Sequence, residues 1–146
     1  PHLTAHRGKL LSGSLHLGVP VHAATFIRRR KIILETQLTR KAGLLRLITV
    51  HEIFHFVWAR LPNSSRRAYA ALLQAEALAH ARGELGESSL LKKTPACTRD
   101  YVCESFCDTA AWLYAGVRSS PDFTLAARWC KRRQAWFEQT LGAKMK

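Results

Sequence analysis

The chain has 146 residues and a mass of 16.5 kDa, with 23 Lys and Arg against 10 Asp and Glu, which gives a formal net charge of +13. Apolar residues make up 47% and charged residues 23%, close to ordinary globular usage, which excludes a disordered basic tail. We expect one domain over residues 1–146. No run approaches the roughly 18 uninterrupted apolar residues of a bilayer span, so we expect no membrane-spanning segment.

The first part of the chain carries strand patterns. Residues 9–17 and 21–27 are candidate strands bounded by Gly and Pro. Residues 32–38 alternate with a period of two, which is typical of a half-buried strand. The basic run Arg28-Arg29-Arg30-Lys31 lies between the last two of these segments, and we expect it to form the exposed turn of a hairpin.

From residue 42 onward the apolar residues recur every three or four positions, as on a helix. The first expected helix covers residues 42–61 and ends at Pro62. Three more follow from their cap and stop signals: 66–82 after Ser64 or Ser65 and before Gly83, 98–116 from Thr98 to Gly116, and 121–141 after Ser120 and before Gly142. Strands followed by helices predict an α+β fold, with a small N-terminal sheet packed on the first helix and a helical C-terminal half.

The first expected helix contains His51-Glu52-Ile53-Phe54-His55, an H-E-x-x-H sequence. Two histidines four residues apart differ by about 40° around a helix and about 6 Å along it, so both imidazoles can reach one ion. Glu52 projects about 100° from His51, where it can take a proton from a metal-bound water. Zinc is the expected metal. The alternative is a pair of core histidines with a solvated Glu between them.

A catalytic zinc site needs a third protein ligand. Glu104 and Asp108 are four residues apart in an otherwise apolar part of the expected helix 98–116. Because buried carboxylates are costly unless they are paired or bind a metal, we predict Glu104 on the ion and Asp108 accepting the N–H of a ligand histidine. The alternatives are an exposed acidic face, or Cys103 or Cys107 as the third ligand.

The four cysteines are Cys97, Cys103, Cys107 and Cys130, and they form no C-x-x-C pair or zinc-finger spacing. Cys103 and Cys107 are four apart on the same expected helix, which favours two small buried apolar side chains over a disulfide or a ligand role. This cysteine usage indicates a reducing compartment, so we expect the protein in the cytoplasm.

His51-Glu52-x-x-His55, followed on another helix by Glu104-x-x-x-Asp108, resembles the gluzincin group of zinc metallopeptidases. The small single-domain members, the minigluzincins and the ImmA/IrrE-like peptidases, are the most similar, and the resemblance covers residues 21–115. It implies Glu104 as the third zinc ligand, with Asp108 supporting the first histidine.

The resemblance also implies an edge strand within residues 21–27, including Ala23 and Ala24, that pairs with an extended peptide substrate. Gluzincins supply a Tyr or His that stabilises the oxyanion, often the largest catalytic contribution. Tyr101, one turn before Glu104, is the first candidate for this role, and Tyr69 and His80 are alternatives.

Two functions follow from these patterns. The first is a zinc-dependent endopeptidase that cleaves a peptide or protein substrate, with Zn²⁺ on His51, His55 and Glu104 and with Glu52 as general base. The second is a basic nucleic-acid-binding module with a structural or vestigial zinc site. The basic residues are dispersed but denser at the sheet end, since residues 1–62 hold 10 of the 23. A hybrid of the two would be a protease that acts on DNA-bound proteins.

Overall fold

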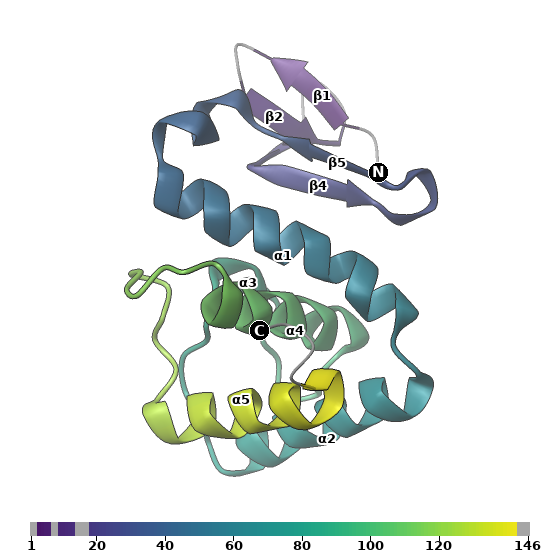
Figure 1. Ribbon diagram of the computed structural model, residues 1–146, viewed down its shortest axis with the longest axis vertical. Helices are drawn as coiled ribbons and strands as arrows, with labels where there is room; N and C mark the ends of the chain where they lie inside the picture. Colours follow the sequence, from purple (N-terminus) through teal and green to yellow (C-terminus); the bar gives the residue numbers. More distant parts are fainter. Residues whose placement is uncertain (1–2, 7–8, 14–17, 143–146) are drawn as a thin grey trace.

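The computed structural model describes residues 3–6, 9–13 and 18–142. Strands come first and helices after, which confirms the α+β class. Small antiparallel sheets lie on one side of helix α1 (Ala42–Arg60), and the later helices lie on its other side (Figure 1). Helix α1 is therefore the central layer, in contact with the β4–β5 hairpin above and with helix α4 below.

Two separate sheets share the N-terminal region. One has the strand order β1-β2-β3 and the other is the hairpin β4–β5, all antiparallel. The bounds are β1 Leu3–His6, β2 Lys9–Ser12, β3 Val19–Val21, β4 Ala23–Phe26 and β5 Lys31–Leu34. The strand predicted over residues 21–27 is thus divided, because Val21 ends β3 and β4 begins two residues later in the other sheet.

The other strand predictions need similar adjustment. The strand predicted over residues 9–17 ends at Ser12, and residues 14–17 lie outside the described residues. The strand predicted over 32–38 ends at Leu34, since Thr36–Arg40 forms the 3-10 turn η2 and buries Leu38.

The basic turn is confirmed. The 3-10 turn η1 (Ile27–Arg29) and the left-handed residue Arg30, with a φ of 49°, connect β4 to β5. The four residues Arg28, Arg29, Arg30 and Lys31 are all exposed.

Five helices make up the rest of the described chain: α1 Ala42–Arg60, α2 Asn63–Leu78, α3 Glu87–Lys92, α4 Arg99–Tyr114 and α5 Ala127–Leu141. Helices α1 and α4 match their predicted positions closely. Thr98 caps α4 as expected, because its hydroxyl oxygen accepts the backbone N–H of Tyr101.

The predicted bounds of α2 and α5 are wrong at one or both ends. Helix α2 begins at Asn63, directly after Pro62, so Ser64 and Ser65 lie inside it instead of capping it. It also ends at Leu78, before Gly83. Gly83 is needed for another reason: it has a φ of 78°, and a Cβ there would lie 2.3 Å from the backbone oxygen of Thr124.

Helix α5 begins six residues later than Pro121, its predicted first residue. Ser120 caps a turn instead, with its hydroxyl oxygen accepting the N–H of Asp122. The predicted end before Gly142 is confirmed. The short helix α3 was not predicted, because its six residues are too few to show a helical period.

Aromatic side chains from four helices form the main core. Phe54 of α1, Tyr69 of α2, Phe106 of α4 and Phe137 of α5 are all buried in one cluster. The rings of Phe106 and Phe137 stack with centroids 4.9 Å apart. This packing holds α4 against α1, which fixes the relative position of the two helices that carry the predicted metal ligands.

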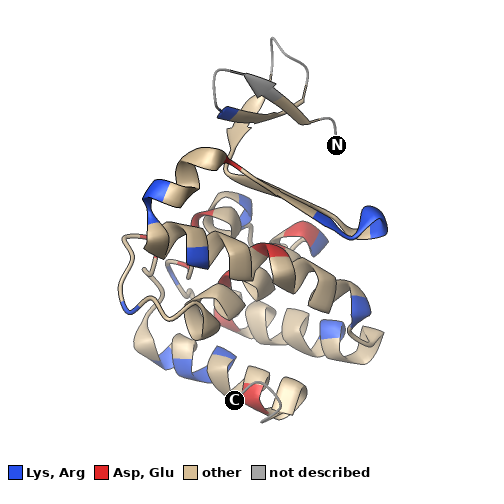
Figure 2. Cartoon of the chain, turned by 45° about the horizontal axis from the view of Figure 1, so that its top comes forward, with Lys and Arg blue, Asp and Glu red and all other residues tan. Residues whose placement is uncertain are grey.

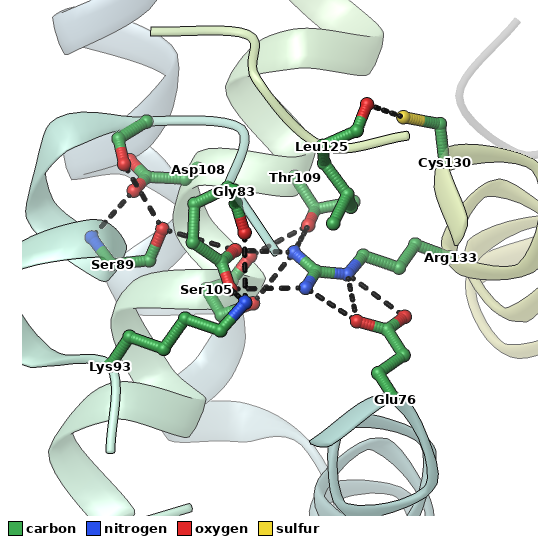
Figure 3. A network of polar contacts seen from close by, with 12 residues as sticks. Glu76, Gly83, Ser89, Lys93, Ser105, Asp108, Thr109, Leu125, Cys130 and Arg133 are labelled. Carbon is green, nitrogen blue, oxygen red and sulfur yellow. Dashed lines mark hydrogen bonds and ion pairs between the residues drawn. The ribbon is translucent and has the colours of Figure 1, made fainter. Parts of the chain in front are cut away.

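A buried ion network forms a second anchor (Figure 3). Arg133 of α5 is fully buried and donates to Glu76 of α2 at 2.7 Å and to Glu84, in the segment after α2, at 2.8 Å. It also donates to the hydroxyl of Ser105 on α4 at 3.0 Å. Because a buried charge must be paired and hydrogen-bonded, these contacts fix the segment after α2 against α4. The same segment leads into α3 and the candidate site.

By length and composition alone, α1 could also cross a membrane. The core helix of a soluble protein passes the same test, so this is weak evidence for a span. The absence of a membrane-spanning segment therefore stays a prediction.

Candidate metal centre

The two histidines of the H-E-x-x-H sequence lie one turn apart on α1 and face α4. Their ring centroids are 4.9 Å apart and the rings are nearly perpendicular, at 77°. His51, His55 and Cys107 of α4 form a group that could hold a metal ion, because one ligand atom of each lies within 4.8 Å of the others. The packing of α1 on α4 therefore creates a potential metal site.

Both ring nitrogens of His51 face carboxylates from α4. Nδ1 lies 2.7 Å from Oδ1 of Asp108, and Nε2 lies 3.1 Å from Oε2 of Glu104. Burial alone would lower the pKa of His51, but these two carboxylates more than offset it and raise that pKa to about 10. A cation that binds at Nε2 must therefore displace a proton.

Asp108 is held from its other side by the segment that contains α3. The backbone N–H of Ser89 donates to its Oδ2 at 2.8 Å. A Cβ on Gly86 would lie 2.2 Å from the carboxyl carbon of Asp108. The backbone at Gly86 is extended, a conformation that any residue can adopt. Glycine is therefore required there only because a side chain would collide with Asp108. The orientation of Asp108 is therefore set by α1, through His51, and by the segment that contains α3, through Gly86 and Ser89.

The ring of His55 is oriented by thiols. Its Nδ1 lies 3.6 Å from Sγ of Cys103 and 3.5 Å from Sγ of Cys107, while its Nε2 lies 3.9 Å from Oε2 of Glu104. A hydrogen bond from Cys107 lowers the pKa of Cys103, and contact with His55 lowers it further. Burial raises the pKa of Cys107. All four cysteines are free thiols, so the disulfide alternative does not hold. Cys107 is buried as predicted, whereas Cys103 is half-buried.

Glu104 presents one oxygen to the histidines and the other to a lysine. Lys92 of α3 donates to Oε1 at 2.7 Å. Burial alone would raise the pKa of Glu104, but hydrogen bonds from His51 and Lys92 lower it to about 2. Its side chain is 15% exposed and that of Asp108 is 8% exposed, so the alternative of an exposed acidic face does not hold.

Glu52 lies beside the histidines at the wall of a cavity of ≈ 670 Å³ that His51, His55 and Glu104 also line. The hydroxyl of Thr25 in β4 donates to its Oε2 at 2.6 Å. The buried Glu52 carboxylate is thus fixed by the hairpin, and it is not the solvated group of the alternative reading.

Strand β4 borders the same cavity. Ala23 and Ala24 line it, and β4 pairs only with β5 among the described strands. Its second edge is therefore free of a strand partner within the described part of the chain.

The structure does not bring Tyr101 to this cavity. It is buried, and its hydroxyl donates to Glu84 in the ion network around Arg133. The two alternatives also lie elsewhere: the hydroxyl of Tyr69 contacts Ser105 and Thr109, and His80 is exposed just beyond the end of α2. The prediction of Tyr101 rested on its helical face alone, and the segment after α2 covers that face.

Three residues of the site were missed from the sequence. Thr25 binds Glu52, Ser89 binds Asp108 and Lys92 binds Glu104. Each contact joins segments that are far apart along the chain, and none belongs to a recognisable motif. Only the tertiary arrangement could reveal them.

Comparison of the chain with protein-family models, with curated proteins and with solved structures found no match. The resemblance to gluzincins therefore depends on the two motifs and on the geometry described above. A function can be argued only from the chemistry of the site.

Proposed function

We propose that the protein is a zinc-dependent metallopeptidase of the gluzincin type. His51 Nε2, His55 Nε2 and Glu104 Oε2 would hold the ion, and Glu52 would act as general base. The single observation that carries this proposal is that one oxygen of Glu104 faces the Nε2 atoms of both histidines.

The distances support this ligand set. Zinc binds imidazole nitrogen and carboxylate oxygen at about 2.0–2.2 Å with tetrahedral geometry, so two ligand atoms are roughly 3.3 Å apart. Oε2 of Glu104 lies 3.1 Å and 3.9 Å from the two Nε2 atoms. A shift of a few tenths of an ångström at His55 would complete the arrangement.

The outer contacts support the same choice against Cys107. Metal-bound histidines usually donate their second nitrogen to a supporting group. Asp108 occupies that position for His51, and the two thiols occupy it for His55. Cys107 therefore lies behind the ring of His55, whereas Glu104 lies in front of it.

When bound, zinc would polarise the scissile carbonyl and lower the pKa of the attacking water toward 7. Glu52 would take a proton from that water at its carboxylate and deliver it to the leaving amine. Thr25 holds this carboxylate in place. The free edge of β4 at Ala23 and Ala24 would bind the peptide backbone as an added strand.

The test uses the purified full chain loaded with zinc. We expect about one equivalent of zinc, retained in Glu52→Gln and lost in His55→Ala and Glu104→Ala. Cleavage of denatured casein, followed by mass spectrometry, should be lost in all three variants. Glu87→Gln is the matched control, because Glu87 lines the same cavity but is exposed.

Cleavage by Glu52→Gln at the parent rate would overturn the mechanism. A protein that binds no zinc would overturn the whole proposal.

A further inference from the structure

The turn of the β4–β5 hairpin carries four adjacent positive charges. Arg28, Arg29, Arg30 and Lys31, here named the basic tip, are all exposed. No ion pair found among the described residues includes any of them. Figure 2 shows this turn at the end of the hairpin away from β3, and its 3-10 part η1 contacts α1. The basic tip is therefore a concentrated charge without a partner in the described part of the chain.

The basic tip continues directly from the strand that borders the cavity. Ile27, the residue before Arg28, lines the cavity with Ala23, Ala24 and Thr25 of β4. Thr25 also binds Glu52, so it marks the level of the proposed general base along the strand. Strand β4 ends at Phe26, where the 3-10 turn η1 follows, and Lys31 is the strand partner of Phe26. A strand advances about 3.3 Å per residue, so the Lys31 end of the basic tip lies about one residue, or about 3.3 Å, beyond the level of Thr25.

The charges inside the cavity have the opposite sign. Five acidic residues line it: Glu52, Glu87, Glu104, Asp108 and Asp122. The single lysine there, Lys92, is paired with Glu104. Much of the remaining wall is apolar, with Leu44, Leu47 and Ile48 from α1. With zinc bound to neutral histidines, the five carboxylates still exceed the positive charges of Lys92 and the ion by two. The cavity therefore disfavours a polyanion and accepts neutral or apolar side chains, while the basic tip just beyond it attracts negative charge.

We propose that the basic tip is a specificity site for a peptide with acidic side chains outside the cavity. A peptide paired with β4 would place neutral residues in the cavity and would bring its next residues, beyond the Phe26 end of β4, close to the basic tip. This inference rests on the proposed function, since it uses the same strand edge for substrate binding. A nucleic acid fits less well, because its regularly spaced phosphates would also have to pass the acidic cavity.

The experiment measures binding instead of cleavage. The protein is the zinc-loaded Glu52→Gln variant, and the probes are fluorescein-labelled dodecapeptides with a neutral Ala/Val/Ser centre. One Glu peptide carries four Glu residues at its N-terminal end, and the other carries them at its C-terminal end. Each has a matched peptide with Gln at the same four positions. By fluorescence anisotropy in 50 mM salt, we expect one Glu peptide to bind about tenfold more tightly than its Gln counterpart, as for three exposed ion pairs of ordinary strength.

Two sets of substitutions locate the effect. The triple variant Arg28→Gln, Arg29→Gln and Lys31→Gln should lose the preference for Glu. The control triple variant is Arg128→Gln, Lys131→Gln and Arg132→Gln, which removes the same charge from exposed positions on α5 outside the cavity. It should keep the preference. The variant Arg28→Glu and Arg29→Glu leaves the tip with no net charge, because Arg30 and Lys31 remain, and it should also lose the preference for Glu.

Equal binding of the Glu and Gln peptides would overturn the inference, as would equal losses in the two triple variants. Tighter binding of a single-stranded 20-nucleotide DNA than of either Glu peptide, lost in the tip variant alone, would overturn it in favour of a nucleic-acid site. Failure of the proposed function is seen separately: a parent protein that cleaves nothing but shows the tip-dependent preference retains the acidic-peptide site without being a peptidase.

Discussion

The carboxylate of Asp108 lies 2.7 Å from Nδ1 of His51, and this contact determines which nitrogen of the ring faces Glu104. The second oxygen of Asp108 accepts the backbone N–H of Ser89, so the carboxylate cannot rotate without losing a buried hydrogen bond. Helix α4 thus supplies both carboxylates that contact the His51 ring, Glu104 at Nε2 and Asp108 at Nδ1. The orientation of His51 depends on the segment around α3 as well as on α1 and α4.

Asp108→Asn tests this orientation. An amide of the same shape loses the negative charge that fixes the Nδ1–H tautomer, so we expect zinc affinity to fall by about 10–100-fold. Titration with zinc against a competing chelator at constant pH measures the change. Asp122→Asn, an exposed position of the same cavity, is the control and should bind like the parent. Equal affinities for Asp108→Asn and the parent would mean that the Asp108–His51 contact plays no part in metal binding.

Gly86→Ala tests the same contact from the opposite side. The added methyl group would collide with the carboxyl carbon of Asp108, from which a Cβ lies 2.2 Å. We expect a loss of about 1–3 kcal/mol in the free energy of unfolding, the usual cost of overpacking, together with weaker zinc binding. Urea unfolding and the chelator titration measure the two effects. Gly43→Ala in α1 is the control, since its Cβ would meet only Val117, at 4.0 Å; a similar loss there would exclude the steric explanation.

The third prediction separates Glu104 from Cys107 as the third ligand. In the cobalt-substituted protein, a thiolate ligand gives a strong charge-transfer band in the near ultraviolet, whereas a carboxylate does not. We expect no such band, a visible spectrum unchanged in Cys107→Ser, and a changed spectrum in Glu104→Ala. Cys130→Ser is the control for removing a buried thiol outside the site. A band that disappears in Cys107→Ser would assign the metal to His51, His55 and Cys107.

The helical part of the candidate site could be predicted from the sequence because its spacing is local. His51 and His55 face one direction wherever the helix forms, and the four-residue interval from Glu104 to Asp108 places both carboxylates on one face of α4. Pro62 and Thr98 are strong local signals for the ends of α1 and α4, and both helices lie where predicted. Periodicity and cap chemistry therefore sufficed for these elements.

Long-range contacts could not be predicted in this way. Tyr101 has the helical phase expected of an active-site residue, yet Glu84 binds its hydroxyl inside the protein. The position of Glu84 depends on the buried Arg133, some 50 residues further along the chain. The strand predicted over residues 32–38 ends early, at Leu34, for a similar reason, since Leu38 is buried through the 3-10 turn η2 and not through a longer strand. Tertiary burial overrides the local pattern at both positions.

The last prediction concerns pH and the buried ion network. Burial alone would raise the pKa of Glu84, but the charge and hydrogen bonds of Arg133 lower it below its ordinary value. A carboxylate with a lowered pKa in the folded state contributes stability above its unfolded pKa of about 4.3, and that stability is lost as the pH falls through the folded pKa. We therefore expect the free energy of unfolding to decrease below about pH 4.3.

Glu84→Gln tests this assignment by urea unfolding at pH 7, 5 and 3. At pH 7 the variant should be less stable by about 3 kcal/mol or more, because it leaves Arg133 buried with one partner fewer. Its stability should also fall less than that of the parent between pH 5 and pH 3, since the titrating group is gone. Glu138→Gln, an exposed position on α5, should follow the parent at every pH. If Glu84→Gln loses as much stability on acidification as the parent does, another carboxylate is responsible for the acid transition and the network of Arg133 does not control it.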